Sequence, residues 1–404
     1  MSTPETGRAP QTGVGAPAGF QVRTASAGLA DDGRDDLTVV VSESPAVSSA
    51  VFTRSRFAGP SVVLSREAAG HGAARGVVVL ARNANVATGE AGAAHAAEIR
   101  QRVAGTVGLS PDQLLIASTG IIGVPYPMGR IRAALDRLRW PFGGADFDAA
   151  ARAIMTTDTH PKLARVRCGD GATILGIAKG VGMIAPDMAT LLTFFFTDAQ
   201  LSRAQLDATF RAVVARTFNA VSIDTDTSTS DTAAIIANGR AGRVDPDEFH
   251  DRLHAAALDL TKQVARDGEG ATKLIKVRVT GARDDAQAKR VARAIVDSPL
   301  VKTAVHGGDP NWGRVAMAIG KCQDDLDLRP ERITISFGEL EVYPRRPDGA
   351  GTAGTAALAE QLTAELAGDE VVIRVALGIG GGAFTAYGCD LTEGYIRINA
   401  SYST

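Results

Sequence analysis

Runs of aliphatic and β-branched residues along the chain predict a set of strands. Some runs alternate apolar with polar positions, the pattern of a sheet with one buried face, and others are continuously apolar, as in a fully buried strand. The predicted strands are DLTVVVSE near residue 40, GVVVLA near 79, LLIAS near 116, ITISFGELEVY near 338 and VVIRVAL near 374.

Between these runs, apolar residues recur at helical spacing and predict three long helices. They are EAGAAHAAEIRQRVAG around residue 97, DPDEFHDRLHAAALDLTKQVARDG around 256 and DDAQAKRVARAIVDSP around 291. Asp245 or Asp247 can cap the second of these helices. Strands and helices mix without a strict alternation, so an α+β and a layered α/β architecture both remain open.

The segment KGVGMIAPDMATLLTFFFTDA, Lys179 to Ala199, departs from these patterns. GVGMIA fits the dinucleotide fingerprint G-x-G-x-x-G/A, and ATILGIAK before it is typical of a strand. However, Pro186 and Asp187 fall where that fingerprint needs a continuing helix, and proline is tolerated only in a helix's first turn. The segment therefore disfavours a nucleotide site. LLTFFFT after it predicts a buried strand.

Composition and charge limit the functional classes. The chain has 404 residues, 45% of them apolar, enough for one large or two ordinary domains with a sizeable core. Lys and Arg total 43 against 45 Asp and Glu, which argues against nucleic acid or an anionic membrane as the main partner. No run approaches the roughly 20 apolar residues of a membrane span.

The N-terminus and the cysteines indicate an intracellular protein. MSTPETGRAPQTGVGAPAGF lacks the apolar core of a signal peptide and is typical of a flexible leader. Cys168, Cys322 and Cys389 lie far apart and form no C-x-x-C pair. We therefore expect a reduced protein of the cytoplasm.

Two patterns suggest metal sites, and each lacks an essential residue. His250 and His254 lie four apart on a predicted helix, but HDRLH lacks the glutamate of the zinc-protease motif. DTDTSTSDT, from Asp224, begins like a calcium loop, but Thr229 stands in place of the glycine and Ile235 in place of the last glutamate. We therefore predict no metal.

Threonines next to glycine or acidic residues are frequent, as in STGIIG, IMTTDT, ATLL and DGEGATK. Taken singly, such a threonine is more often a turn or a cap than a catalyst. Its hydroxyl is a poor nucleophile without an adjacent base, and no histidine lies near these motifs. Cutting the chain before a threonine supplies that base, because its new α-amine titrates at about pH 8.

Seven motifs, taken in order, resemble the ornithine acetyltransferases, also called glutamate N-acetyltransferases. This resemblance spans about residues 19 to 404 and is greatest to the actinomycete members associated with clavulanic acid gene clusters. The motifs are STGIIGVPYPM, IMTTDTHPK, KGVGMIAPDMATLL, FNAVSIDTDTSTSDT, DGEGATK, HGGDPNWGRVAMAIG and DLTEGYIRINASYST.

The resemblance implies a self-cleaving enzyme with an N-terminal nucleophile. Its fold would be a layered α/β sandwich of the αββα type with a smaller C-terminal α/β part. Residues 1–18 would be a disordered leader. Cleavage between Ala189 and Thr190 would then divide the rest into an α chain over 19–189 and a β chain over 190–404, and the two chains would share one core. No cofactor is implied, and the αβ pairs would form an oligomer of α2β2 or larger.

The resemblance also assigns roles to residues. Thr190 would be the nucleophile and contact the substrate. Thr119 would offer its hydroxyl and Gly120 its N–H to the oxyanion. Further substrate contacts would come from five residues, the last two in the C-terminal tail: Thr156, Lys179, Glu269, Asn399 and Thr404.

The implied reaction moves acetyl from N-acetylornithine to glutamate through an acetyl-Thr190 intermediate, a step of arginine biosynthesis. Three alternatives remain open. A related self-cleaving aminopeptidase or amidohydrolase would give the acyl group to water, and a relative in antibiotic biosynthesis would use a secondary-metabolite amino acid. A nucleotide-binding or non-enzymatic protein would use GVGMIA.

Overall fold

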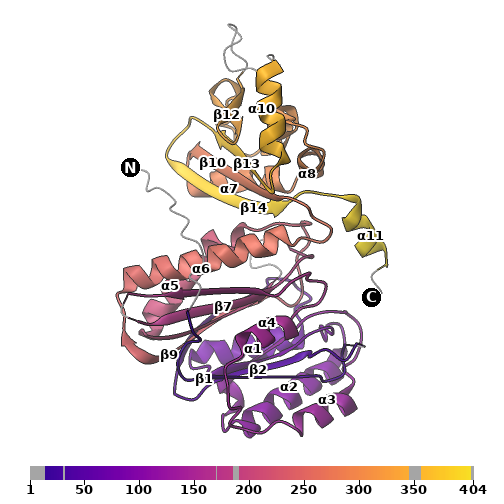
Figure 1. Ribbon diagram of the computed structural model, residues 1–404, viewed down its shortest axis with the longest axis vertical. Helices are drawn as coiled ribbons and strands as arrows, with labels where there is room; N and C mark the ends of the chain where they lie inside the picture. The colour runs from indigo at the N-terminus through magenta and orange to yellow at the C-terminus, as the bar shows by residue number, and fades with distance from the viewer. Residues whose placement is uncertain (1–13, 31, 170, 185–190, 345–355, 402–404) are drawn as a thin grey trace.

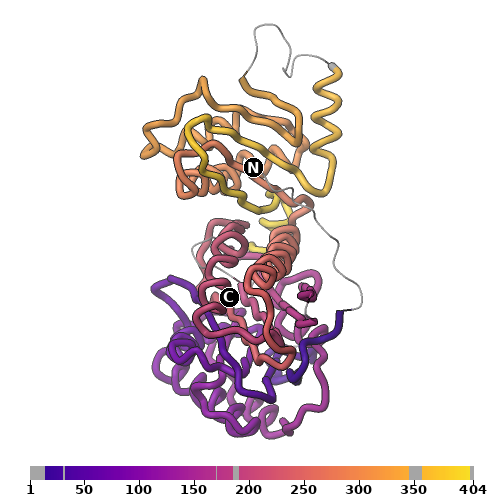
Figure 2. The backbone as a smooth tube through the Cα atoms, turned by 90° about the vertical axis from the view of Figure 1, so that its left-hand side faces the viewer, coloured from indigo at the N-terminus to yellow at the C-terminus, as the bar shows by residue number. Residues whose placement is uncertain are grey.

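The protein forms two lobes, one above the other (Figures 1 and 2). The computed structural model describes residues 14–30, 32–169, 171–184, 191–344 and 356–401. The larger, N-terminal lobe holds two sheets, and the smaller, C-terminal lobe holds a third.

The first sheet of the N-terminal lobe has four strands in the order β1-β2-β4-β5. β1, β2 and β4 pair antiparallel, and β4 and β5 pair parallel. α2 and α3 pack on its outer face through a cluster that includes Val78, Ile99 and Ile131. The elements are β1 Phe20–Ala25, β2 Leu37–Ser42, β4 Gly76–Leu80, α2 Gly89–Thr106, η1 Pro111–Gln113, β5 Leu114–Ser118 and α3 Met128–Leu135.

The second sheet has five strands in the order β3-β9-β8-β7-β6, and α5 and α6 cover its outer face. The LLTFFFT run is its central strand, β8, and the prediction of a buried strand is confirmed. Phe195 points to the helical face, whereas Phe194 and Phe196 point to the first sheet. The elements are β3 Val47–Phe52, β6 Lys162–Arg167, β7 Thr173–Lys179, β8 Leu192–Gln200, α5 Arg203–Arg216, η2 Phe218–Ala220, β9 Thr232–Arg243 and α6 Pro246–Arg266.

Two helices, α1 (Pro60–His71) and α4 (Phe147–Ala153), lie between the two sheets. Phe147 of α4 packs against Phe196 of β8, with 5.1 Å between ring centroids. Outer helices thus cover both sheets, with α1 and α4 between the sheets, and the predicted layered α/β class is confirmed.

The C-terminal lobe is the smaller α/β part that was predicted. Its sheet has the order β12-β11-β13-β10-β14. α11 leaves this lobe and runs back beside the N-terminal one (Figure 1). The elements are β10 Leu274–Ala282, α7 Asp285–Val296, α8 Pro299–His306, α9 Trp312–Gly320, η3 Pro330–Arg332, β11 Thr334–Phe337, β12 Leu340–Tyr343, α10 Ala356–Ala367, β13 Glu370–Ala376, β14 Gly382–Cys389 and α11 Glu393–Ser401.

Local chemistry explains where several elements begin and end. Asp245 caps α6, because its carboxylate accepts the N–H groups of Asp247 and Glu248, and Pro246 occupies the first turn. ITISFGELEVY forms two strands rather than one, since Gly338 adopts a φ of 56° and turns the chain. Over the described ranges, none of the helices has the length and apolar character needed to cross a membrane.

Candidate active site

A pocket of about 190 Å³ lies where the ends of β5 and β7 meet α11. All six of the predicted site residues that the structure describes line it. They are Thr119, Gly120, Thr156, Lys179, Glu269 and Asn399. The other predicted site residues, Ala189, Thr190 and Thr404, lie outside the described residues.

A larger hollow of about 960 Å³ lies along β3 between α1 and α5. It is lined by Arg54, Arg66, Arg203 and Arg211, and none of the predicted site residues that the structure describes reaches it. We assign the site to the smaller pocket because the candidate catalytic groups converge there, and size alone does not indicate chemistry.

Thr119 and Gly120 follow β5 directly and form one wall of the pocket. The Thr119 N–H donates to the Leu80 carbonyl at 3.0 Å, which holds this turn against β4. Gly120 has a φ of 130°, and a Cβ there would lie 2.1 Å from the carbonyl carbon of Arg82. Only glycine fits this position, because the backbones of the two loops touch.

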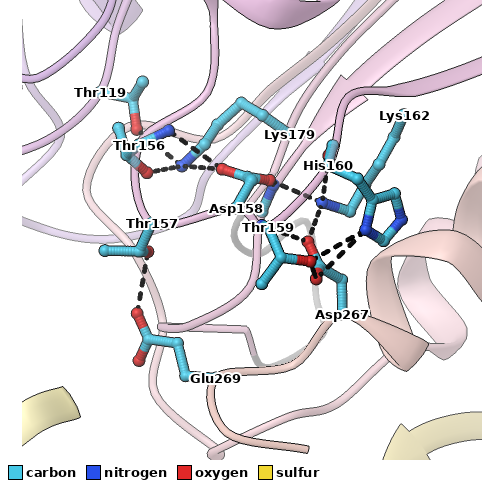
Figure 3. A network of polar contacts seen from close by, with 11 residues as sticks. Thr119, Thr156, Thr157, Asp158, Thr159, His160, Lys162, Lys179, Asp267 and Glu269 are labelled. Atoms are coloured by element: carbon cyan, nitrogen blue, oxygen red, sulfur yellow. Dashed lines mark hydrogen bonds and ion pairs between the residues drawn. The ribbon is translucent and has the colours of Figure 1, made fainter.

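Lys179 ends β7, and its amine is directed into the pocket (Figure 3). Nζ donates to Thr156 Oγ1 at 2.7 Å and to Thr119 Oγ1 at 3.4 Å. Asp158 Oδ2 lies 3.8 Å away. Burial lowers the pKa of Lys179, and the carboxylate of Asp158 opposes this shift.

Behind Lys179 lies a buried ionic network that sequence reasoning missed (Figure 3). Lys162 Nζ, fully buried, donates to Asp158 Oδ1 at 2.8 Å and to Asp267 Oδ2 at 2.5 Å. Asp267 also accepts the N–H and the hydroxyl of Thr159, and His160 Nδ1 lies 3.4 Å from it. The i, i+4 spacing of Asp158 and Lys162 was the available signal.

Burial alone would raise the pKa of Asp158, but Lys179 and Lys162 outweigh it and hold that pKa well below its usual range. The carboxylate is therefore ionised at neutral pH. It also accepts the N–H groups of Thr156 and Gly180, at 3.0 and 2.8 Å. Asp158 thus joins the chain before β6 to the end of β7, and both segments line the pocket.

Glu269 and the C-terminal helix α11 close the opposite wall. Glu269 Oε1 accepts from Thr157 Oγ1 and Oε2 from Asn399 Nδ2, each at 2.9 Å. α11 is held close because Gly270 and Gly394 approach each other, and a Cβ on Gly270 would lie 2.4 Å from the Gly394 carbonyl carbon. The tail is therefore part of the pocket, as the resemblance implies.

The DTDTSTSDT segment contacts the chain between β7 and β8 on both sides of residues 185–190. The carboxylate of Asp224 accepts the N–H groups of Met183 and Ile184 at 2.5 and 2.8 Å. At the other end, the N–H of Thr232 donates to the Leu191 carbonyl at 3.2 Å. Leu192 then pairs with Lys179 across the two strands.

The other candidate sites gain no support from the geometry. Among the described residues, no group of three His, Cys, Asp or Glu side chains is placed to hold a metal ion. The rings of His250 and His254 stack on α6 with 6.3 Å between centroids. ATILGIAK is β7, but Pro186 and Asp187, on which the nucleotide interpretation depends, lie outside the described residues.

Known proteins resemble this chain over nearly its whole length. The family model described as "ArgJ family" matches residues 21–404. The glutamate N-acetyltransferase Oat2 of Streptomyces clavuligerus is 66% identical over 390 residues, which cover 96% of this chain and 98% of that protein. The chain belongs to the ArgJ family.

Other relatives match this chain to different extents. The arginine biosynthesis bifunctional protein ArgJ of Rhodococcoides fascians is 53% identical over 390 residues, 96% of this chain and 94% of the relative. A crystal structure of the ArgJ protein of Bacillus halodurans is 42% identical, with a TM-score of 0.47, and covers 52% of this chain and 98% of that one.

ArgJ membership confirms the ornithine acetyltransferase resemblance, and the chain is an N-acyltransferase. The match covers nearly the whole chain, so it contradicts the alternative of an unrelated nucleotide-binding or non-enzymatic protein.

Proposed function

We infer that this chain is a glutamate N-acetyltransferase that takes acetyl from N-acetylornithine after cutting itself between Ala189 and Thr190. One observation carries the inference. Six residues that the resemblance selects from distant parts of the sequence line one pocket. The names of its relatives, a glutamate N-acetyltransferase and arginine biosynthesis proteins, support the same reaction.

Self-cleavage creates the catalytic base. The Thr190 hydroxyl attacks the Ala189 carbonyl, the peptide bond becomes an ester, and water hydrolyses the ester. The products are a carboxylate on Ala189 and a free α-amine on Thr190. The two residues after Thr190 support this role. Leu191 is bound by Thr232, and Leu192 pairs with Lys179, which lines the pocket.

Acetyl transfer then uses the same hydroxyl twice. The α-amine of Thr190 takes the hydroxyl proton as Oγ attacks the acetyl carbonyl, and it returns the proton to the departing amine of ornithine. The amine of glutamate attacks the acetyl ester in the second half-reaction. The hydroxyl of Thr119 and the N–H of Gly120 stabilise each oxyanion, and one such donor contributes about 3 kcal/mol.

The pocket suits a small zwitterionic amino acid. Its volume of about 190 Å³ is below the range of about 300–1,000 Å³ typical of drug-sized ligands. Lys179 offers a cation, Glu269 an anion and Asn399 an amide, so the pocket can bind a carboxylate and an amine together. Thr404 completes the binding of the amino-acid head group.

The test supplies N-acetylornithine labelled in its acetyl group to the purified enzyme. Mass spectrometry should find the label on a peptide that begins at Thr190, and addition of glutamate should remove it as N-acetylglutamate. A label on any other residue, or acetyl transfer without a labelled enzyme, contradicts the proposed intermediate.

A self-cleaving hydrolase is the remaining alternative on this architecture. It would release ornithine at the same rate with or without glutamate, because water would accept the acetyl group. The proposed transferase should release only about one equivalent of ornithine per site until glutamate is added. Equal steady-state rates in both conditions would favour the hydrolase.

The setting of the enzyme is also part of the proposal. We place it in the cytoplasm, as an oligomer of αβ pairs that acts on small molecules without nucleic acid or membrane. Size-exclusion chromatography with light scattering tests the assembly, and a mass of one αβ pair would contradict it.

A further inference from the structure

The position of Lys179 has a consequence for the oxyanion site. An ammonium group has three N–H donors and no acceptor. Two of its donors meet hydroxyl oxygens, Thr156 Oγ1 at 2.7 Å and Thr119 Oγ1 at 3.4 Å, and Asp158 Oδ2 lies 3.8 Å away. Because Thr119 Oγ1 accepts from Lys179, its own proton is left to donate to a different group.

We propose that protonated Lys179 is a positioning residue that sets the direction of the Thr119 hydroxyl, and that Asp158 acts through Lys179 to keep it charged and in place. This rests on the proposed role of Thr119 as an oxyanion donor. A neutral amine has a lone pair and can accept the Thr119 proton. That reversal would turn the oxyanion donor away from the substrate.

The groups around Lys179 determine whether its amine is charged. The residue is only 8% exposed, so its charge depends on its neighbours rather than on bulk water. Asp158 and Glu269 favour the charged form, whereas Lys162 and Arg82 disfavour it. Asp158 is itself fixed by Lys162, which Asp267 holds at 2.5 Å from the far side.

The proposal gives the pH dependence of acetyl transfer a sign. The rate falls as pH rises through the pKa of Lys179, because deprotonation reverses the Thr119 hydroxyl. Burial lowers that pKa, so the loss begins below the usual lysine range. The α-amine of Thr190 has the opposite effect, since it must lose its proton to act as a base, and it sets the acidic limb.

Two substitutions should move the basic limb of the pH profile of kcat in opposite directions. Asp158→Asn removes an anion near the ammonium and should move the limb down by about one pH unit. Arg82→Gln removes a cation and should move it up. If the two variants only disturbed packing, each would lower the rate, but they would not shift the pH of the basic limb in opposite directions.

The control makes the same chemical change at a residue that does not line the pocket. Asp36 is fully buried and accepts the N–H groups of Ala27, Leu29 and Ala30, so Asp36→Asn tests the cost of neutralising a buried aspartate. It should leave the basic limb in place. If Asp158→Asn does not fold, Arg82→Gln alone still decides, since the proposal requires an upward shift.

The outcomes separate this inference from the proposed function. If the wild-type enzyme does not transfer acetyl, the proposed function itself is wrong. Normal transfer with a basic limb that neither Asp158→Asn nor Arg82→Gln moves would overturn the role of Lys179 and leave the reaction intact. If Asp36→Asn shifts the basic limb as far as Asp158→Asn does, the proposed role of Lys179 is also wrong.

Discussion

At the residue scale, Gly120 shows how one position combines a backbone requirement with a catalytic one. Its φ of 130° is unfavourable for other residues, and the Arg82 backbone occupies the space of any Cβ. A side chain at 120 must therefore push the Thr119 turn away from β4, and the N–H of Gly120 moves with that turn.

Gly120→Ala should lower kcat about a hundredfold or more, the loss seen when one oxyanion donor is removed. Gly123→Ala is the matched control, because Gly123 lies in the same loop with a φ of 81° but has open space where an added methyl group would lie. Steady-state kinetics of both variants decide. Equal losses would mean that loop strain, rather than the position of the oxyanion donor, limits the rate.

The sequence predicted site residues that lie in recognisable motifs, and the six described ones meet in one pocket. It did not predict the ionic network behind them. Lys162 and Asp267 are 105 positions apart, and nothing in either local sequence indicates the other. Asp158, which joins them to Lys179, lies within the IMTTDTHPK motif but looks like an ordinary turn residue there.

At the scale of elements, one segment contacts the chain on both sides of the proposed cleavage site. Asp224 binds the N–H groups of Met183 and Ile184, and Thr232 binds Leu191. Met183 has a φ of 51°, which costs a non-glycine residue about 1–2 kcal/mol and needs such support. We infer that this segment positions the loop for self-cleavage.

Asp224→Asn should slow self-cleavage at least tenfold, because the amide offers one acceptor oxygen to two N–H donors. The Asp198 carboxylate, at the other end of β8, also accepts two backbone N–H groups, from Ala18 and Thr173. Asp198→Asn is therefore a matched control that should leave the cleavage rate near wild type. Time courses of band formation on denaturing gels measure both, and equal slowing would exclude a specific role for Asp224.

Elements with clear periodicity or a strong cap were predicted, among them α2, α6, α7 and the apolar strands β2, β4 and β5. Other strands had weaker signals. β3 (VSSAVF) and β9 (TAAIIANGRAGR) contain serine, alanine and glycine, which are poor strand indicators, and they are strands because their neighbours pair with them. Tertiary context supplied what local propensity did not.

At the scale of the whole molecule, the proposed cut falls between two strands that are neighbours in one sheet, rather than between domains. β7 and β8 are hydrogen-bonded neighbours on either side of it, and β3 pairs with β9 in the same way. The first lobe's core likewise mixes residues from both sides, such as Phe147 and Phe196. The two chains would therefore be held together by the hydrogen bonds between these strands and by the shared core.

We expect the two chains to co-elute in native size-exclusion chromatography and to separate only under denaturing conditions. The physical reason is that separating them would expose buried strands on both pieces, at about 25 cal/mol per Å² of apolar surface. Fragments that separate in native buffer while activity persists would contradict a shared core.

The central claim is that Thr190 becomes a chain end, and N-terminal sequencing of the purified protein tests it most directly. The wild type should give two chains, one of which begins TLLTF, whereas Thr190→Ala should remain a single folded chain of full length. A fully active protein that is intact, or that is cut at any other bond, would contradict the account.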